Sequence, residues 1–296
     1  MKDSKLKTIA LALFAMALWG SAFPVLKLTY KYFEIAQDDY ASKILIAGIR
    51  FFFSGIFVLI YMAMKEKQSF KLFKPNLKFI ILIGLISTAI NYILFYIGVG
   101  NTTGIKSSIL QSASTFLSVI FATMFLDEKL TSYKVVALIL GFIGIIVSNL
   151  NKGFDLNMTF TGEGFLLLNA MSIAISFVIV KKYGKGIPST VITAGQMISG
   201  SIILLIIGLI FQTASLNVNL PGVLLVAYSS VLSALAFTIW YYVLANNPAS
   251  QMSMLRLFIP IFGAVFSAVV LGESLTIYSL FGLIFVVLGV YIINKE

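Results

Sequence analysis

Residues 126–149 read LDEKLTSYKVVALILGFIGIIVSN, and residues 271–294 read LGESLTIYSLFGLIFVVLGVYIIN. The two stretches align without a gap at an offset of 145 residues, and both begin Leu-x-Glu-x-Leu-Thr-x-Tyr. Two apolar helices share many Leu and Ile by chance, but this opening carries polar residues between apolar runs, where a chance match is harder to obtain. The chain is therefore expected to be an internal duplication.

The residues around this repeat predict a membrane protein. Hydrophobic residues make up 59% of the 296 residues and charged residues 11%, and the mean hydropathy is +1.02. Soluble domains contain closer to half apolar and a quarter charged residues. A helix needs about 20 apolar residues to cross the hydrocarbon core of a bilayer. Ten apolar stretches can be drawn, at 8–27, 44–64, 78–99, 104–126, 133–150, 163–180, 190–212, 222–245, 249–271 and 277–293.

These stretches predict an all-α membrane protein with ten transmembrane helices arranged as two inverted five-helix repeats. The first repeat is expected over residues 8–150 and the second over residues 163–295. Because five is an odd number, the two repeats enter the membrane in opposite directions. This is the usual architecture of secondary transporters, which hold their substrate near the midplane between the repeats. A duplicated scaffold protein could share the symmetry, but it would need no polar residues in its interior.

The net charge of +10 is interpreted as an orientation signal, because cytoplasmic loops carry an excess of Lys and Arg. With a cytoplasmic N-terminus, fourteen of the 21 basic residues fall on the cytoplasmic side and five on the outer side. Both termini are therefore expected in the cytoplasm, and the protein in the cell (plasma) membrane. The expected partners are the lipid bilayer and a small-molecule substrate. No nucleic acid partner is expected, and a homodimer is left open.

Absent residue types exclude several kinds of chemistry. The chain has no Cys and no His, which excludes disulfides, thiol nucleophiles, histidine proton relays and the usual ligands of zinc. No Asp or Glu falls inside an expected span, and Glu163 lies at the edge of one, so proton antiport through a buried acid is disfavoured. We expect no cofactor, no metal site and no enzymatic activity. For Glu128 and Glu273 in the repeated turns we expect a structural role, with Thr131 and Thr276 capping the following helices.

A polar stripe occurs at the same place in both repeats. In the fourth span it follows one helical face at steps of 4, 3 and 4, and the offset of 145 residues carries it to the ninth span. Its members are Gln111, Thr115, Ser118 and Ala122 in the first repeat, and Arg256, Pro260, Gly263 and Ser267 in the second. For Ser118, Gly263 and Ser267 we favour a seam of small residues that lets helices approach closely.

Arg256 is the strongest candidate for binding a substrate anion. It lies seven residues into its span, about 10 Å deep, and an arginine at that depth should face a cavity or a partner. Pro260 cannot donate to the carbonyl of Arg256, so a free carbonyl is expected beside the guanidinium. Snorkelling to the cytoplasmic surface is the alternative. For Arg50, near the outer end of the second span, snorkelling or structural pairing is favoured.

The other candidates are polar or aromatic residues inside the spans. Asn91 lies in the middle of a span and must find a hydrogen bond. Trp19 is also too deep for an interfacial anchor, whereas Tyr241 and Tyr242 near a helix end are expected to be anchors. The predicted substrate-binding residues are Arg256, Gln111, Asn91, Trp19, Trp240 and Asn169.

Residues 17–23, Ala-Leu-Trp-Gly-Ser-Ala-Phe, resemble the opening of EamA-type transporters of the drug/metabolite transporter superfamily. The two Leu-x-Glu-x-Leu-Thr turns, with Pro260 eleven residues before the second, resemble the end-of-repeat signature of that family. The resemblance covers the whole chain. It implies ten helices in two inverted repeats in a prokaryotic plasma membrane, and transport of small metabolites, often amino acid export, with sugar-phosphate and nucleotide-sugar relatives. The first repeat departs from the pattern, because Thr115 stands where the second repeat has Pro260.

The sequence therefore predicts a secondary transporter that exports an amino acid or related compound by alternating access. One alternative is a facilitator or importer of a sugar phosphate or nucleoside-type metabolite. A phosphate substrate calls for more than one inward basic residue, so Arg50 in the same cavity as Arg256 would support it. The pattern is also compatible with a non-transporting membrane scaffold or an intramembrane enzyme. The enzyme is disfavoured, because the interior offers no Cys, His or acid.

Overall fold

A computed structural model describes residues 2–101, 104–149, 158–212, 215–272 and 277–293, and within these ranges every regular element is a helix. The elements of the first half are α1 (Lys2–Tyr32), α2 (Tyr40–Lys65), η1 (Lys67–Leu72), α3 (Leu77–Ile83), η2 (Gly84–Ile90), α4 (Asn91–Gly100), α5 (Gly104–Phe125) and α6 (Ser132–Asn149). Those of the second half are η4 (Phe160–Gly164), α7 (Phe165–Tyr183), α8 (Ser189–Phe211), α9 (Leu220–Asn246), α10 (Ala249–Leu255), α11 (Phe258–Leu271) and α12 (Ile277–Ile293).

The described helices are long and apolar enough for a multi-pass membrane protein. Seven helical segments have the length and composition of a membrane span: Leu6–Tyr32, Tyr40–Lys65, Leu77–Val99, Phe160–Tyr183, Ser189–Phe211, Leu220–Asn246 and Ala249–Leu271. Three apolar helices are shorter: Ala113–Phe125, Ser132–Val147 and Leu280–Ile292. An all-helical membrane protein is confirmed, and the count of ten spans stays a prediction.

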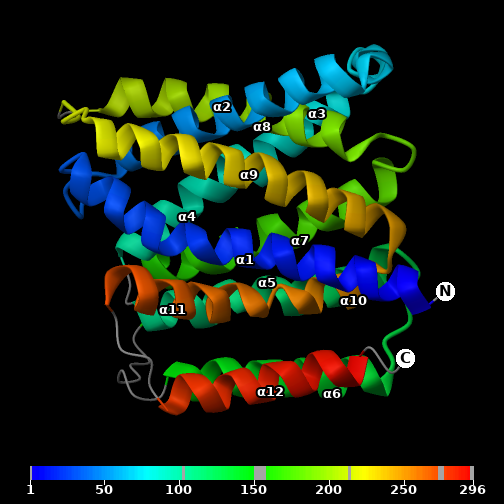
Figure 1. The fold of residues 1–296 in the computed structure, drawn as a ribbon. Helices are drawn as coiled ribbons and strands as arrows, with labels where there is room; N and C mark the ends of the chain where they lie inside the picture. Colours follow the sequence, from blue (N-terminus) through cyan, green and yellow to red (C-terminus); the bar gives the residue numbers. More distant parts are fainter. Residues whose placement is uncertain (1, 102–103, 150–157, 213–214, 273–276, 294–296) are drawn as a thin grey trace.

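Equivalent helices of the two halves pack on each other. The fifth helices of the two halves, α6 and α12, pack on each other at one edge of the bundle, and the second helices, α2 and α8, pack on each other at the opposite edge (Figure 1). Between these edges α1 packs on α9 and α11, while α7 packs on α4 and α5. If each helix is replaced by its equivalent in the other half, every one of these contacts becomes another helix contact of the structure. This is expected for two repeats related by an approximate two-fold axis.

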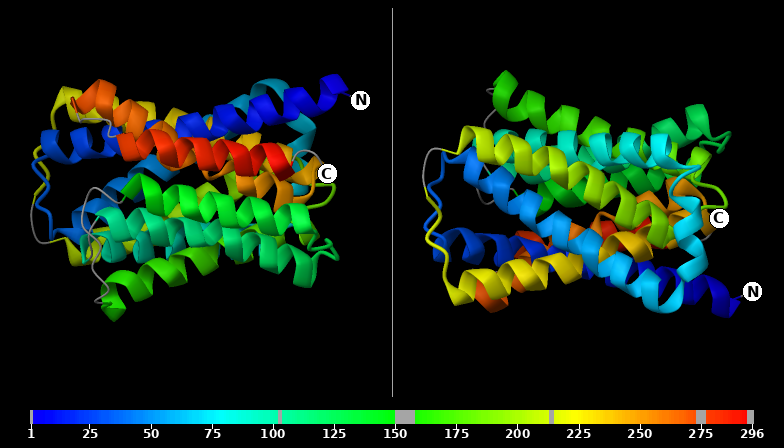
Figure 2. Two further views of the ribbon diagram at one scale, coloured as in Figure 1. Left: turned by 90° about the horizontal axis from the view of Figure 1, so that it is seen from below. Right: turned by 90° about the horizontal axis from the view of Figure 1, so that it is seen from above.

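The two repeats run through the bundle in opposite directions. The equivalent helices α6 and α12 are antiparallel, and α1 begins at the same end of the bundle at which α12 ends (Figures 1 and 2). This arrangement agrees with the odd number of crossings expected in each repeat.

Close helix contact depends on glycine where α1 crosses α11. A Cβ on Gly20 would lie 2.9 Å from the backbone nitrogen of Gly263, and one on Gly263 would lie 2.8 Å from the ring of Phe23. Any larger residue would force the two helices apart. The prediction that Gly263 belongs to a small-residue seam is therefore confirmed.

Two of the expected spans are not continuous α-helices. The third changes from α-helix to π-helix over Gly84–Ile90 and returns to α-helix at Asn91. Such π-helical turns are frequent at functional sites. The ninth breaks between Leu255 and Phe258.

The break in the ninth span corrects one prediction. The carbonyl of Arg256 is not free, because it accepts a hydrogen bond from the backbone N–H of Ile259 at 3.0 Å. Pro260 has no N–H to offer, so the chain tightens by one residue, and the preceding N–H makes the bond that Pro260 cannot make.

Candidate functional site

A row of aromatic rings crosses the centre of the bundle between the two arginines of the spans. We call Phe177, Trp240, Trp19, Phe237 and Phe51 the aromatic row. The centroids of successive rings lie 5.3, 5.9, 5.0 and 6.5 Å apart. The Cζ atom of Arg256 lies 4.7 Å from the ring of Phe177 at one end, and the Cζ atom of Arg50 lies 5.2 Å from the ring of Phe51 at the other. Both distances are typical of cation–π contacts.

The side chain of Arg256 points into the bundle but makes few contacts with polar groups there. Besides the ring of Phe177, its Nη1 reaches the Oγ of Ser114 on α5 at 3.5 Å, the upper limit for a hydrogen bond. Its Nε is buried and has no hydrogen-bond partner among the described residues. Arg256 forms no ion pair with a residue that the structure describes. An arginine without an ion pair is costly inside a bilayer, so this position is suited to an anion.

Arg50 is buried and paired, with only 3% of its surface exposed. Its Nε donates to the backbone oxygen of Ser229 at 3.2 Å and to the Oγ of Ser233 at 2.9 Å, both on α9. Snorkelling of Arg50 is therefore wrong, and structural pairing is confirmed.

The two tryptophans lie side by side in the middle of the aromatic row. Trp240 is fully buried, and the ring nitrogens of Trp19 and Trp240 are both buried without a hydrogen-bond partner in the described part of the chain. A buried indole N–H usually finds a partner. These two donors are therefore available to a bound molecule.

Asn91 and Asn169 meet where α7 packs on the interrupted third span. The Nδ2 of Asn169 donates to the backbone oxygen of Asn91 at 2.8 Å, while its Oδ1 is buried without a partner in the residues that the structure describes. Ser172, one turn along α7, donates to the backbone oxygen of Ile86 at 2.7 Å. The π-helical segment is thus held by side chains of the second repeat.

Gln111 is linked to Arg256 only indirectly. Its backbone oxygen accepts from the Oγ of Ser114 at 2.7 Å, and the same Oγ faces Arg256. The aligned stripe pointed to Gln111, but the long arginine side chain reaches the residue almost one turn further along α5. Ser114 was missed for this reason. Phe177, Phe237 and Phe51 were missed because a ring in an apolar helix carries no signal that separates it from core packing.

Tyr241 is not the interfacial anchor that was expected. It is 1% exposed, its hydroxyl donates to the Oε1 of Gln196 at 2.5 Å, and the Oγ of Ser87 lies 3.4 Å away. Burial excludes contact with lipid headgroups. Tyr242, one residue later, is 55% exposed and faces outward, as an anchor does.

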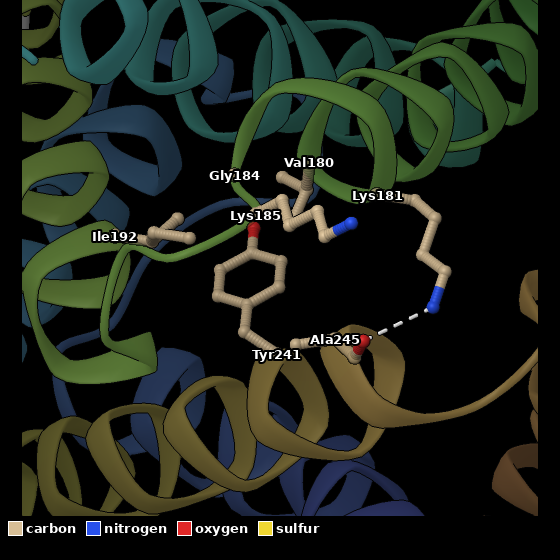
Figure 3. Close-up of a pocket in the computed structure, with 7 residues that line it drawn as sticks. All are labelled: Val180, Lys181, Gly184, Lys185, Ile192, Tyr241 and Ala245. Carbon is tan, nitrogen blue, oxygen red and sulfur yellow. Dashed lines mark hydrogen bonds between the residues drawn. The ribbon is translucent and has the colours of Figure 1, made fainter.

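A cavity of about 220 Å³ opens between the ends of α7 and α9 (Figure 3). Lys181 and Lys185 of α7 and the loop after it lie on one side, with Tyr241 and Ala245 of α9 on the other. Lys181 is fixed there, because its Nζ donates to the backbone oxygens of Leu244 at 2.8 Å and Ala245 at 3.1 Å. A second, more open cavity of about 460 Å³ lies between α1, α9 and α11 and is mostly apolar. None of the six predicted binding residues lines either cavity.

Glu128 joins the two repeats at the start of α10. Its carboxylate accepts from the backbone N–H of Ala249 at 2.6 Å and of Ser250 at 3.1 Å, and also from the hydroxyl of Ser250. Lys134 lies 3.7 Å from the same carboxylate. Thr131 accepts from the N–H of Lys134 at 3.4 Å, in agreement with a cap on α6. The first repeat therefore caps the short helix of the second repeat that ends at Arg256; Glu273 and Thr276 lie outside the described residues.

These features define a class of protein: a multi-pass helical membrane protein of two repeats, with two arginines in its spans and, among the described residues, several buried polar groups that lack a partner. The family model described as "EamA-like transporter family" matches residues 6–150 and again residues 160–295. The chain belongs to this family, as the resemblance of residues 17–23 and of the two repeated turns implied.

Relatives that match nearly the whole chain carry the names of transporters. The chain is 30% identical over 301 residues to "Uncharacterized transporter YvbV" of Bacillus subtilis, which covers 99% of this chain and 93% of that protein. It is 26% identical to an "Uncharacterized transporter" of Archaeoglobus fulgidus, covering 98% and 99% of the two chains. A solved structure described only as "Crystal structure of protein" superposes with a TM-score of 0.81 at 13% identity, over 98% of this chain and 96% of that chain, and so shares the fold. Family and relatives indicate a membrane transporter rather than an enzyme.

Proposed function

We propose that this protein is a secondary transporter that exports an amino acid or a related carboxylate-bearing metabolite by alternating access. It does so with ten spans in the plasma membrane, with both termini in the cytoplasm. The residues proposed to bind the substrate are those predicted from the sequence, joined by Ser114 and Phe177.

The observation that carries this proposal is the state of Arg256. The guanidinium lies at a helix break, stacked on Phe177, with one long hydrogen bond and a buried, unpartnered Nε. An arginine fork matches the two oxygens of a carboxylate. Transporters place substrate sites at discontinuous spans, where backbone and side chains can change partners between states.

The side chains around Arg256 can bind the ammonium group and the side chain of an amino acid. Phe177, Trp240 and Trp19 offer ring faces, on which either an ammonium group or an apolar side chain can lie. The ring nitrogens of both tryptophans and the Oγ of Ser253 are buried without partners in the described chain. Each such group costs about 1–3 kcal/mol. A scaffold protein would have no reason to keep them, whereas a transporter satisfies them when its substrate binds.

The coupling is proposed not to use a buried acid. Glu163 lies inside the described span Phe160–Tyr183 and is only 4% exposed, so the expectation that no acid falls inside a span is wrong. It lies in the first turn of its helix, where it accepts from the N–H of Thr159 at 2.7 Å, and we propose that it stabilises that turn. Flux is expected to follow the substrate gradient or a coupling without an intramembrane carboxylate.

The test is flux in proteoliposomes against a panel of amino acids and sugar phosphates. Wild type is compared with Arg256→Ala, Arg256→Lys and, as a matched loss of one positive charge, Lys71→Ala on the exposed segment η1. We expect saturable flux of at least one amino acid that is lost in Arg256→Ala, partly kept in Arg256→Lys and unchanged in Lys71→Ala. Undiminished flux in Arg256→Ala contradicts the role of this arginine.

A second candidate is an organic phosphate as substrate. Arg50 and Arg256 contact the two ends of the same aromatic row, so both positive charges border one region. The same panel decides between the candidates. Flux of a sugar phosphate that depends on both arginines, with no amino acid transported, favours the phosphate.

A further inference from the structure

Arg50 has binding capacity that its structural bonds leave unused. Its Nε is the atom that holds α9, through Ser229 and Ser233. Its two terminal nitrogens, Nη1 and Nη2, make no hydrogen bond to a described residue. They are the pair that binds a carboxylate in the two-pronged geometry typical of arginine.

Three tyrosines pack around Phe51, the ring that lies under this guanidinium. The ring of Tyr92 on α4 lies 4.4 Å from that of Phe51 and 6.1 Å from that of Tyr96, and Tyr30 of α1 packs against the same cluster. The hydroxyls of Tyr30 and Tyr96 are buried and are among the groups that lack a hydrogen-bond partner in the described chain. Tyr96 is 6% exposed, so water does not freely solvate its hydroxyl.

The positive charge of Arg50 is also uncompensated. It forms no ion pair with any residue that the structure describes. It lies ten residues after Tyr40, about 15 Å into the span, where a lone charge is expensive unless an anion or water reaches it. The contact with Phe51 offsets only part of this cost.

We propose that Arg50, with the hydroxyls of Tyr30 and Tyr96, forms a second binding position for a carboxylate group. This inference rests on the proposed function, because the carboxylate is that of the transported compound. The substrate is held first at Arg256, about 10 Å from the cytoplasmic ends of the helices. The aromatic row then leads to Arg50 in the outer half, where the carboxylate binds before release.

The binding test isolates Arg50 by working in an Arg256→Gln background. Purified protein is titrated with sodium acetate, a carboxylate without a side chain, against sodium chloride at equal ionic strength, and its thermal midpoint is followed. A ligand that binds only the folded protein raises that midpoint. We expect acetate to raise the midpoint of Arg256→Gln, and the half-saturating concentration to be about tenfold higher or more when Arg50→Gln is added.

The tyrosine variants separate binding from folding. If proteins with Arg50→Gln do not fold, Arg256→Gln with Tyr30→Phe and Tyr96→Phe keeps the guanidinium and its bonds to α9. This variant is expected to need a severalfold higher acetate concentration. An acetate response equal to that of Arg256→Gln alone, in the tyrosine variant or in the Arg50→Gln variant, overturns the proposal.

Flux measurements distinguish this proposal from the proposed function. If wild type transports no compound of the panel, the export proposal fails, while the acetate titration still decides whether Arg50 binds a carboxylate. If transport is observed, Arg50→Gln should lower kcat of export with little change in the cytoplasmic KM, because it acts after loading. A raised KM with unchanged kcat contradicts the outer position.

Discussion

Arg50 and Arg256 are the same residue type in the same bilayer, but their surroundings differ. Arg50 lies in the uninterrupted helix α2, and two oxygens of α9 fix its Nε. Arg256 lies where α10 ends, and it rests on a ring and one long hydrogen bond. The side chain of Arg50 is therefore fixed without a ligand, whereas that of Arg256 lacks hydrogen-bond partners that a ligand can supply.

The two environments indicate which arginine can move. An arginine at a helix break can change direction when two or three backbone dihedrals change, and such positions serve as hinges in domain motions. An arginine bonded to a neighbouring helix moves only with that helix. We therefore expect Arg256 to change its contacts between transport states and Arg50 to keep those of its Nε.

The largest expected effect tests the incomplete position. Arg256→Ala should lower kcat/KM for export about 100-fold or more, because removing one partner of a buried charged contact costs about 2–5 kcal/mol. Its thermal midpoint should change little, since few bonds of the protein are lost. Proteoliposome flux and thermal unfolding of the same preparation check both parts, and a midpoint that falls as far as in Arg50→Ala removes the contrast between the two arginines.

Arg50→Ala should instead affect stability. The single hydrogen of its Nε is shared between two acceptors on α9, and loss of this charged hydrogen bond is expected to destabilise the protein by about 2 kcal/mol, or about 5 °C in thermal midpoint. Ser233→Ala, which removes one of the two acceptors and keeps the charge, should give a smaller decrease. A midpoint equal to wild type in both variants would show that the paired arginine contributes no more to stability than the unpaired one.

Glu128→Gln tests whether the helix that leads to Arg256 is held by its cap. The carboxylate uses one oxygen for the N–H of Ala249 and the other for Ser250. Glutamine has only one acceptor oxygen, so one of these bonds is lost and the other is weaker, and we expect a loss of about 1–2 kcal/mol. Asp127→Asn is the matched control, because Asp127 is the exposed neighbour in the same turn. Hydrogen exchange should rise in α10 and not in α2. Equal exchange in both helices contradicts a local role of Glu128.

The smallest effect concerns Tyr241, whose hydroxyl reaches α8. Tyr241→Phe removes the bond to Gln196 and should cost about 1 kcal/mol. Tyr242→Phe, on the exposed side of the same helix, should cost nothing measurable. Thermal unfolding of the pair checks this, and equal midpoints would show that the bond to Gln196 adds no net stability.

Much of the fold could be predicted from the sequence, because apolar runs mark the spans and the internal repeat marks the two halves. The apolar spans and the depth of Trp19 follow from composition and spacing. The π-helix of Gly84–Ile90 could not be predicted, since it depends on Ser172 and Asn169, which are distant in the chain and belong to the second repeat. The partners of the carboxylate of Glu128 lie even further along the chain, again in the other repeat.

Three of the predicted binding residues lie together, whereas the contacts around them were not predicted. Arg256, Trp19 and Trp240 do lie at one aromatic row, because rare polar and bulky residues in spans are informative on their own. The rings of Phe177, Phe237 and Phe51 have no such signal among 26 phenylalanines. Which ring lies under which arginine depends on the rotation of each helix, and that is set by packing.

The pairing of α6 with α12 and of α2 with α8 has a consequence for how the molecule is assembled. The most extensive helix contacts join the two repeats, and few lie within either one. Each half therefore lacks neighbours that only the other can supply, like two subunits of an obligate dimer that share a single polypeptide. A chain cut between residues 150 and 160 should regain its fold only when both pieces are made in the same membrane.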